Sequence, residues 1–580
     1  MVESCRVDSK IQRAGDIDCT PPDAGFSRRN FLRNVAATTA GLSCLDFLSY
    51  FAEFGLPFDR KAFAFADGAA SAHRNPHFLV YWFIEGGWMG YDMFNPVSTD
   101  NNVLKRLKSP SDEFYRVLKF GQPDYGIYKH GNIRHGYLAS PGRELFSDLA
   151  VLSSMHTGTG HSTERLRAHM GSYKFRAQQE REEDERSVMQ AFAEVYGQPY
   201  ALPNLSWHWW LSDGELNIAQ YTGRKGYYHA LGPAHAHTIY PGTPARLRSF
   251  FSRMMATSGD AVNREVQRFL EAPHRAFLRD ENIEAVKSYR SAREIYLSLA
   301  AKGLKLDQNV IRRLFVDPAL REEFQVSQDD ELLTYRSVNG NKARSKFAPS
   351  TNVQAMMAYE LMRAGLSCSF WIESRDVRRF DSHMSRARLW TGKEQRPVGQ
   401  KDQSEMLEQD LWSPLKTFVR KLKETEYEGT GSSLFDHTTI VLNSEFGRSM
   451  HGNVDSILRS KDSEANKKKK IGGQDISQHW RVTSAAFLGG KVAGGKQYGG
   501  AGEKTLEAIP LLPNGEMDPA YDKLTGERIE GRQPDPRASI PNHGDVYATA
   551  LYLSDINPRG RGRNERGPLR YIRAHKTRTF

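Results

Sequence analysis

The chain has 580 residues, and its 80 Lys+Arg outnumber its 69 Asp+Glu to give a formal net charge of +11. Hydrophobic residues at 39% and charged residues at 26% are ordinary for a globular protein, which excludes a largely disordered, collagen-like or coiled-coil chain. At the usual ~100–200 residues per domain, this length predicts one large domain with insertions or a few smaller domains. The basic balance favours nucleic acid, anionic lipid or a polyanionic substrate without choosing among them.

Residues 1–66 have the layout of a twin-arginine signal peptide. Arg28 and Arg29 precede an acid-free, mildly apolar stretch at 35–42, and Ala64-Phe-Ala66 offers a small-x-small cleavage site. The pattern predicts export by the twin-arginine translocase, so that a mature chain of 67–580 is periplasmic or secreted. The alternative is a cytosolic N-terminal helix that contains an Arg-Arg pair. Acidic and basic residues balance within 1–66, so the net positive charge belongs to the mature chain.

Three further features of 67–580 limit its class. No segment offers the roughly 20 unbroken apolar residues of a spanning helix, so we expect no transmembrane segment in the mature chain. Cys368 is its only cysteine, so it can form no internal disulfide. Positive charge is dispersed apart from 467–470, and no nucleic-acid-binding motif is present, so we expect no specific nucleic-acid partner.

Apolar runs and amphipathic stretches alternate along the mature chain. Strands are predicted at 77–84, 149–152, 367–372, 438–442 and 484–488, and helices at 162–174, 354–364 and 411–423. The alternation predicts an α/β fold with a mostly parallel central sheet and helices on both faces. A largely helical insertion is expected at about 180–330 and a surface excursion at about 505–540, both within a single domain, 67–580.

Chemistry-bearing side chains follow these strands, where open parallel sheets place their active sites. In chain order they are Asp92, His161, Ser162, Thr163, Asp381, His383, Glu445, Arg448, Asp475 and His479. Asp381 and His383 are two apart, so in extended backbone both side chains share one face and could reach one cation. Taken singly, each residue could equally be a helix cap, an ion-pair partner or a hydrogen-bonded histidine. Together they predict a cation site that faces a hydroxyl.

The same positions carry a resemblance to a known family. The motifs are Glu85-Gly-Gly with Asp92, Phe-Asp381-Ser-His383, Ser-Glu445-Phe-Gly-Arg448, and His479-Trp480 followed by a glycine-rich stretch at 487–499. Over roughly 75–560 the chain resembles the bacterial family called domain of unknown function 1501. Members of that family are typically exported by the twin-arginine route and belong to the alkaline phosphatase and sulfatase superfamily.

The resemblance implies an alkaline phosphatase/sulfatase-like fold and hydrolysis of a phosphate or sulfate ester, small or polymeric, with a divalent metal ion (Ca²⁺, Zn²⁺, Mg²⁺ or Mn²⁺) as cofactor. In such hydrolases a metal lowers the pKa of a hydroxyl and neutralises the transferred group. By this resemblance Ser162 or Thr163 would be the nucleophile with His161 beside it, and Arg448 would bind the substrate's anionic oxygens. The implied metal ligands are Asp92, Asp381, His383, Glu445, Asp475 and His479.

The chain also departs from the superfamily's pattern. Phosphatases of the superfamily usually carry adjacent Asp-His where this chain has Glu445-Phe446. Gln478 stands where the 1501 family usually has an aspartate beside His-Trp, with Asp475 three residues earlier as a substitute. A single metal, or a site that has lost hydrolysis, therefore fits as well as a two-metal phosphatase. The alternative function is a non-catalytic exported protein that keeps the fold and binds anionic envelope polymers.

Overall fold

In the computed structural model, the described residues are 77–96, 127–171, 187–197, 200, 202–207, 313, 317–327, 334–336, 342–344, 349–374, 400–427, 429–448, 463, 479–503, 505–559 and 567–574. They all belong to the unit Tyr50–Phe580. The predicted leader, most of the predicted helical insertion, and Asp381, His383 and Asp475 lie outside them. None of the helices in these ranges has the length and apolar character that crossing a bilayer requires.

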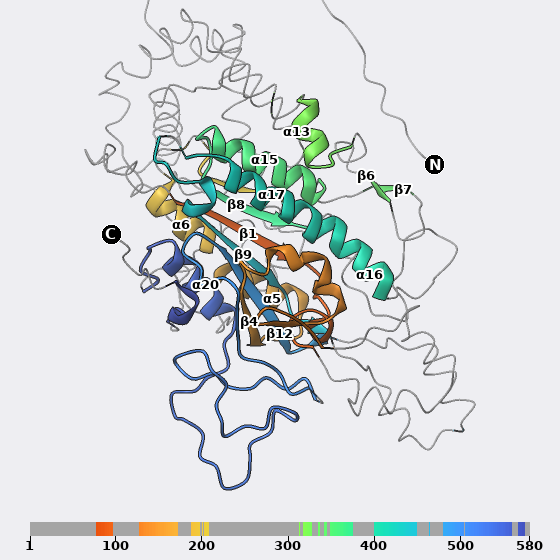
Figure 1. Ribbon diagram of the computed structural model, residues 1–580, viewed down its shortest axis with the longest axis vertical. Coiled ribbons are helices and arrows are strands. Elements are labelled where there is room, and N and C mark those ends of the chain that lie inside the picture. Colours follow the sequence, from red (N-terminus) through yellow and green to blue (C-terminus); the bar gives the residue numbers. More distant parts are fainter. Residues whose placement is uncertain are drawn as a thin grey trace, which may run out of the picture. The chain divides into compact units, whose positions relative to one another are not determined.

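A seven-stranded sheet forms the centre of the described fold, with the spatial order β13-β4-β12-β9-β1-β8-β5 (Figure 1). Its strands are β1 (Phe78–Ile84), β4 (Ala150–His156), β5 (Asn204–Ser206), β8 (Ser369–Glu373), β9 (Thr438–Ser444), β12 (Val482–Gly489) and β13 (Lys496–Tyr498). Neighbouring strands run parallel in β9-β1-β8-β5 and in β13-β4. The predicted α/β class with a mostly parallel sheet is confirmed.

The middle of the sheet is fully buried because its strands are nearly continuous apolar runs. Every residue of β1 and β9 is buried, including the large side chains Trp82 and Phe83. Successive side chains of a strand point to opposite faces. Trp82 accordingly contacts Phe418 on one face of the sheet, whereas Phe83 contacts Trp371 of β8 on the opposite face. Such two-sided burial is expected of a parallel sheet covered by helices.

Helices cover both faces of the sheet (Figure 1). One layer holds α15 (Thr351–Arg363), α16 (Gln400–Leu407), the π-helical turn η9 (Glu408–Trp412) and α17 (Ser413–Glu424). The other layer holds α5 (His161–Met170), α6 (Val188–Tyr196) and α20 (His543–Leu553), which pack on one another and on β8, β1 and β9. The helices predicted at 162–174, 354–364 and 411–423 match α5, α15 and α17, with η9 forming the start of the last.

Strand β12 runs antiparallel to both of its neighbours, β4 and β9. Its first residue, Val482, therefore pairs with His156, which is the last residue of β4. The start of β12 thus lies at the sheet edge where the parallel strands end. This direction brings the segment that precedes β12 to the same edge as the segments that follow β1, β4, β8 and β9.

The smaller elements surround this frame. They are η3 (Gly90–Asp92), β2 (Tyr128–His130), β3 (Ile133–His135), η4 (Tyr137–Leu145), α13 (Pro318–Glu323), β6 (Thr334–Arg336), β7 (Lys342–Arg344), η10 (Leu434–His437), β10 (Gly447–Arg448), β11 (His479–Trp480) and η11 (Arg570–Ile572). Between β13 and α20 the described residues make a long excursion without helices, drawn as the blue loops of Figure 1. Ser154 of β4 anchors it by donating to the carbonyl oxygens of Gly500 and Ile509.

Candidate functional site

Three carboxylates lie at the ends of neighbouring strands. Glu373 is the last residue of β8, while Glu85 and Glu445 directly follow β1 and β9, and all three side chains are buried. Ile84 pairs with Ser444, so Glu85 and Glu445 come next in register. Because strand side chains alternate between faces, the register places all three carboxylates on the face that α5 covers. Burial of several acids together requires a compensating cation.

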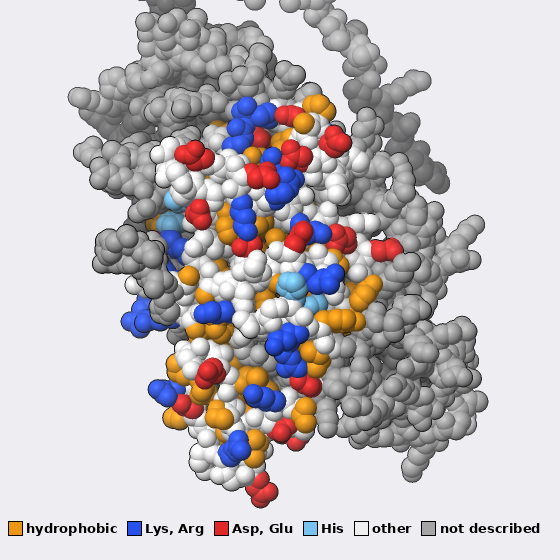
Figure 2. Space-filling view, viewed as in Figure 1, with side chains coloured by type: hydrophobic (Ala, Val, Ile, Leu, Met, Phe, Trp, Pro, Cys, Tyr) orange, Lys and Arg blue, Asp and Glu red, His pale blue; other side chains and the backbone are white. Residues whose placement is uncertain are grey.

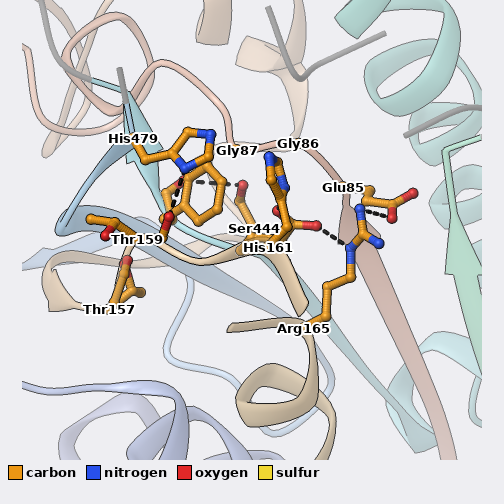
Figure 3. Close-up of polar contacts among 12 residues, drawn as sticks. Glu85, Gly86, Gly87, Thr157, Thr159, His161, Arg165, Ser444 and His479 are labelled. Atoms are coloured by element: carbon orange, nitrogen blue, oxygen red, sulfur yellow. Dashed lines mark hydrogen bonds and ion pairs between the residues drawn. The ribbon is translucent and has the colours of Figure 1, made fainter. Parts of the chain in front are cut away.

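Arg165 of α5 supplies that cation. Its guanidinium forms ion pairs with Glu85 through Nη2 and with Glu445 through Nε, and its side chain is only 7% exposed. Figure 3 shows the side chain reaching up from α5 between the two strand ends. The planar fork of a guanidinium suits two carboxylates that approach from different edges.

The carboxylates differ in their protonation. Burial raises the pKa of Glu373 to about 8, and the negative charge of Glu445 adds to this effect, while Arg165 and the indole of Trp371 oppose it. Burial acts in the same direction on Glu445, but there Arg165 and His161 outweigh it, so the net pKa of Glu445 is lowered. At neutral pH Glu373 is therefore a neutral acid, whereas Glu445 is a carboxylate.

His161 completes the surroundings of Glu445. Its Nδ1 lies 2.5 Å from Glu445 Oε2, and since an ionised carboxylate only accepts, Nδ1 donates. His161 and Arg165 are four residues apart and so occupy one face of α5, which lets them bind opposite oxygens of the same carboxylate. The His161 side chain is 27% exposed, so the buried charge cluster reaches solvent through this imidazole.

His479 of β11 lies against His161. Their ring centroids are 4.5 Å apart, and the Phe446 ring stacks on His479 at 4.2 Å. His479 Nδ1 donates to the carbonyl oxygen of Thr159 at 2.6 Å, as Figure 3 shows. Each imidazole thus has Nδ1 held as a donor, which makes Nε2 the nitrogen that carries the lone pair in the neutral ring.

A buried hydrogen-bond network positions the backbone around Glu445. His543, at the start of α20, donates from Nε2 to the carbonyl oxygen of Glu445 at 3.0 Å. Its Nδ1 accepts from Asn443 Nδ2, which also donates to the Tyr81 hydroxyl. Burial lowers the pKa of His543 to about 4, so the ring is neutral and can accept at Nδ1.

The Glu85-Gly-Gly turn is shaped by close packing. Gly86 and Gly87 have positive φ angles of 94° and 81°, which glycine adopts without strain. A Cβ at Gly87 would also lie 2.5 Å from the Phe446 ring. Arg448 holds this turn from β10, since its Nε donates to the Gly86 carbonyl at 3.1 Å and its side chain is buried. These contacts give Arg448 a part in positioning the turn, whereas its predicted contact with substrate stays a prediction.

The other residues predicted for the site have varied placements. Asp92 lies in η3, is buried, and its Oδ1 accepts the backbone N–H of Tyr137 at 2.8 Å, so it is held by the start of η4. Ser162 and Thr163 lie in the first turn of α5, where Gly160 is the N-cap residue. The structure thus brings together His161, Glu445 and His479. Among the residues it describes, no cluster of three or more His, Cys, Asp or Glu is arranged to hold a metal ion.

Sequence reasoning missed the roles of Glu85, Glu373 and Arg165. An acid that directly ends a continuous apolar run was the available signal for the first two, because such a position is buried. For Arg165 the signal was its spacing of four residues from His161 along a predicted helix. Neither signal identifies the partner, since that depends on strand order.

Comparisons with models of known protein families and with curated protein sequences gave no match to this chain.

Proposed function

We propose that this chain is an exported, metal-dependent hydrolase of the alkaline phosphatase and sulfatase type, acting on a phosphate or sulfate ester. The observation that supports this most directly is the pair His161 and His479 at the carboxyl edge of the sheet. Each imidazole donates from Nδ1 to a fixed acceptor, which is how proteins usually orient histidines that bind metal through the other nitrogen. The predicted twin-arginine leader supports export.

The residues present fit a divalent metal in part. His161 and His479 would hold it through Nε2, and imidazole ligands favour Zn²⁺ over Ca²⁺, Mg²⁺ or Mn²⁺. Glu445 fits the role of orienting His161 better than that of a ligand, because its two oxygens already accept from His161 and Arg165. The further ligands in this proposal are Asp381, His383 and Asp475. A bound metal would polarise the ester and favour ionisation of a hydroxyl nucleophile.

The chain's own groups have defined tasks in this proposal. The first turn of α5 carries Ser162 and Thr163, and its backbone N–H groups are suited to bind an anionic ester oxygen, since Gly160 has no side chain to cap them. Glu445 keeps a proton on Nδ1 of His161 and thereby leaves the lone pair of Nε2 for the metal. Arg448 and His543 hold the Gly86 turn and the Glu445 backbone in place.

The alternative of a non-catalytic polymer-binding protein has less support. Figure 2 shows basic and acidic side chains interspersed over the described part of the visible face. Basic residues of α17 are paired with acids, as in Lys421 with Glu323 and Lys423 with Asp148. A polyanion-binding surface would instead gather charge of one sign.

The test is metal content and turnover of protein purified after export. Wild-type protein should contain a divalent metal by elemental analysis and should hydrolyse an aryl phosphate or an aryl sulfate. His161→Ala and His479→Ala should each lose most of the metal and about 100-fold or more in turnover. His437→Ala, in η10 and bonded to Ser432, serves as the control that should lose neither. Wild-type protein without metal and without turnover of either ester would contradict the proposal.

A further inference from the structure

The carboxyl ends of β8, β1 and β9 form a site built for a cation. Three buried carboxyl groups from three separate segments share one sheet face there, and one of them, Glu373, is a neutral acid at neutral pH. Glu85 and Glu445 remain as the pair whose charges a cation must balance. Proteins place divalent metals in such surroundings, because several carboxylates from adjacent strand ends can share one ion.

Here the cation is part of the chain. Arg165 comes from α5, the helix that carries His161, and it bonds Glu85 on one side and Glu445 on the other. Arginine keeps its charge when buried, unlike lysine, and its planar donors are spread widely enough to bind two carboxylates at once. The guanidinium therefore occupies the space between the ends of β1 and β9.

We infer that Arg165 is the resident cation of this site, standing where a divalent metal would otherwise bind Glu85 and Glu445, and that it positions His161 through Glu445. Arg165 binds Oε1 of Glu445, which leaves Oε2 directed at His161. Only the part concerning His161 rests on the proposed function. The neutralisation of the two carboxylates follows from the ion pairs alone.

The number of metal ions that the protein binds should therefore depend on the side chain of Arg165. In the wild-type protein any metal held by His161 and His479 is separated from Glu85 by the guanidinium. Removal of the guanidinium should open a second cation site between Glu85 and Glu445. A free guanidinium ion of the same shape should also be able to enter this space, since it offers the same donors.

The experiment compares wild-type protein, Arg165→Ala and the control Arg167→Ala, which removes an arginine of the same helix that pairs with Glu164 instead. Bound Mn²⁺ is counted by electron paramagnetic resonance, and melting temperature is measured with guanidinium chloride or sodium chloride at equal ionic strength. Arg165→Ala should bind one more Mn²⁺ per chain than the other two proteins. Its melting temperature should fall by about 5 °C or more and recover with millimolar guanidinium.

If Arg165→Ala does not behave in this way, the inference is wrong, whereas the proposed function is unaffected. An Arg165→Ala protein that folds but gains no Mn²⁺ and does not respond to guanidinium would show that Arg165 is not a replaceable cation. Recovery of ester turnover by guanidinium in this variant alone would support the positioning of His161, and turnover that is unaffected by the substitution would refute it. The Mn²⁺ count remains decisive even if no ester is turned over.

If Arg165→Ala does not fold, a second pair of variants tests the inference. Glu445→Gln removes a charge that Arg165 balances, whereas Glu373→Gln replaces an acid that is already neutral. The melting temperature at neutral pH should therefore fall clearly in Glu445→Gln and should hold or rise in Glu373→Gln. Equal losses in the two variants would mean that Arg165 does not distinguish the carboxylates, which would also overturn the inference.

Discussion

Replacement of Glu373 by glutamine should stabilise the protein at alkaline pH and have little effect at mildly acidic pH. The pKa of Glu373 is about 8 in the folded protein, against 4.5 for an ordinary glutamate, because burial and the charge of Glu445 disfavour ionisation. Between these two pH values the folded protein holds a proton that the unfolded chain has released. The free energy of unfolding therefore falls as pH rises through this range.

The size of the effect follows from the proton linkage. One proton of difference changes the free energy of unfolding by about 1.4 kcal/mol per pH unit. Between about pH 5 and pH 8 the wild-type protein should thus lose about 4 kcal/mol that Glu373→Gln keeps. Glutamine should preserve the local contact, because its amide oxygen can accept the hydrogen bond that the Trp371 indole donates to Glu373 at 3.0 Å.

Urea unfolding followed by tryptophan fluorescence at a series of pH values measures this difference. The quantity of interest is the free energy of unfolding of Glu373→Gln minus that of the wild-type protein, which should rise steadily from mildly acidic to alkaline pH. Glu424→Gln, at the exposed end of α17, is the control for the loss of a carboxylate from the surface. A difference for Glu373→Gln that does not change with pH would refute the reasoning, since it would show that Glu373 is ionised in the folded protein.

Three further predictions concern the surroundings of the site. Gly447→Ala should destabilise the protein by about 3 kcal/mol or more in thermal unfolding, because the new Cβ would overlap the backbone oxygen of Val482. Gly567→Ala is the control, since a Cβ there would have nothing within 4 Å, and it should be neutral or slightly stabilising. Tyr81→Phe removes the hydroxyl that accepts from Asn443 and should cost about 1–2 kcal/mol in urea unfolding; an unchanged midpoint would contradict that contact. Burial lowers the pKa of His543 to about 4, so below about pH 6.5 the unfolded chain binds more protons than the folded protein, and wild-type stability should fall with acidification. His543→Gln should remove this part of the loss. If the free energy of unfolding falls equally in both proteins on acidification, His543 is not a buried neutral imidazole.

The sequence was informative about the central strands because they are buried on both faces. A run such as 77–84 has one interpretation, a strand covered by helices, and the acids and glycines that end it are then placed at the sheet edge. The same reasoning placed Glu445 and His161 at that edge correctly. It could not give the direction of β12, because an apolar run reads the same in either direction and the pairing with β4 and β9 is non-local.

The sequence could not predict which charged side chains form ion pairs, for a similar reason. Glu445 follows the motif's expectation of a carboxylate at the end of β9, but whether it binds a metal or an arginine depends on what the facing helix presents. Arg165 resembles an ordinary surface charge of an amphipathic helix until the helix is docked. Asp92 and Arg448 likewise have buried backbone contacts that only the folded chain defines.

The short β10–β11 pairing fixes where the chain leaves the sheet edge before 449–478 and where it returns after it. Arg448 pairs with His479 and Gly447 with Trp480, so the chain leaves the sheet edge and returns to it at one point. The entropic cost of closing such a loop grows only slowly with its length. A change in length within 449–470 should therefore cost little stability, because the chain still leaves the edge at Arg448 and returns to it at His479.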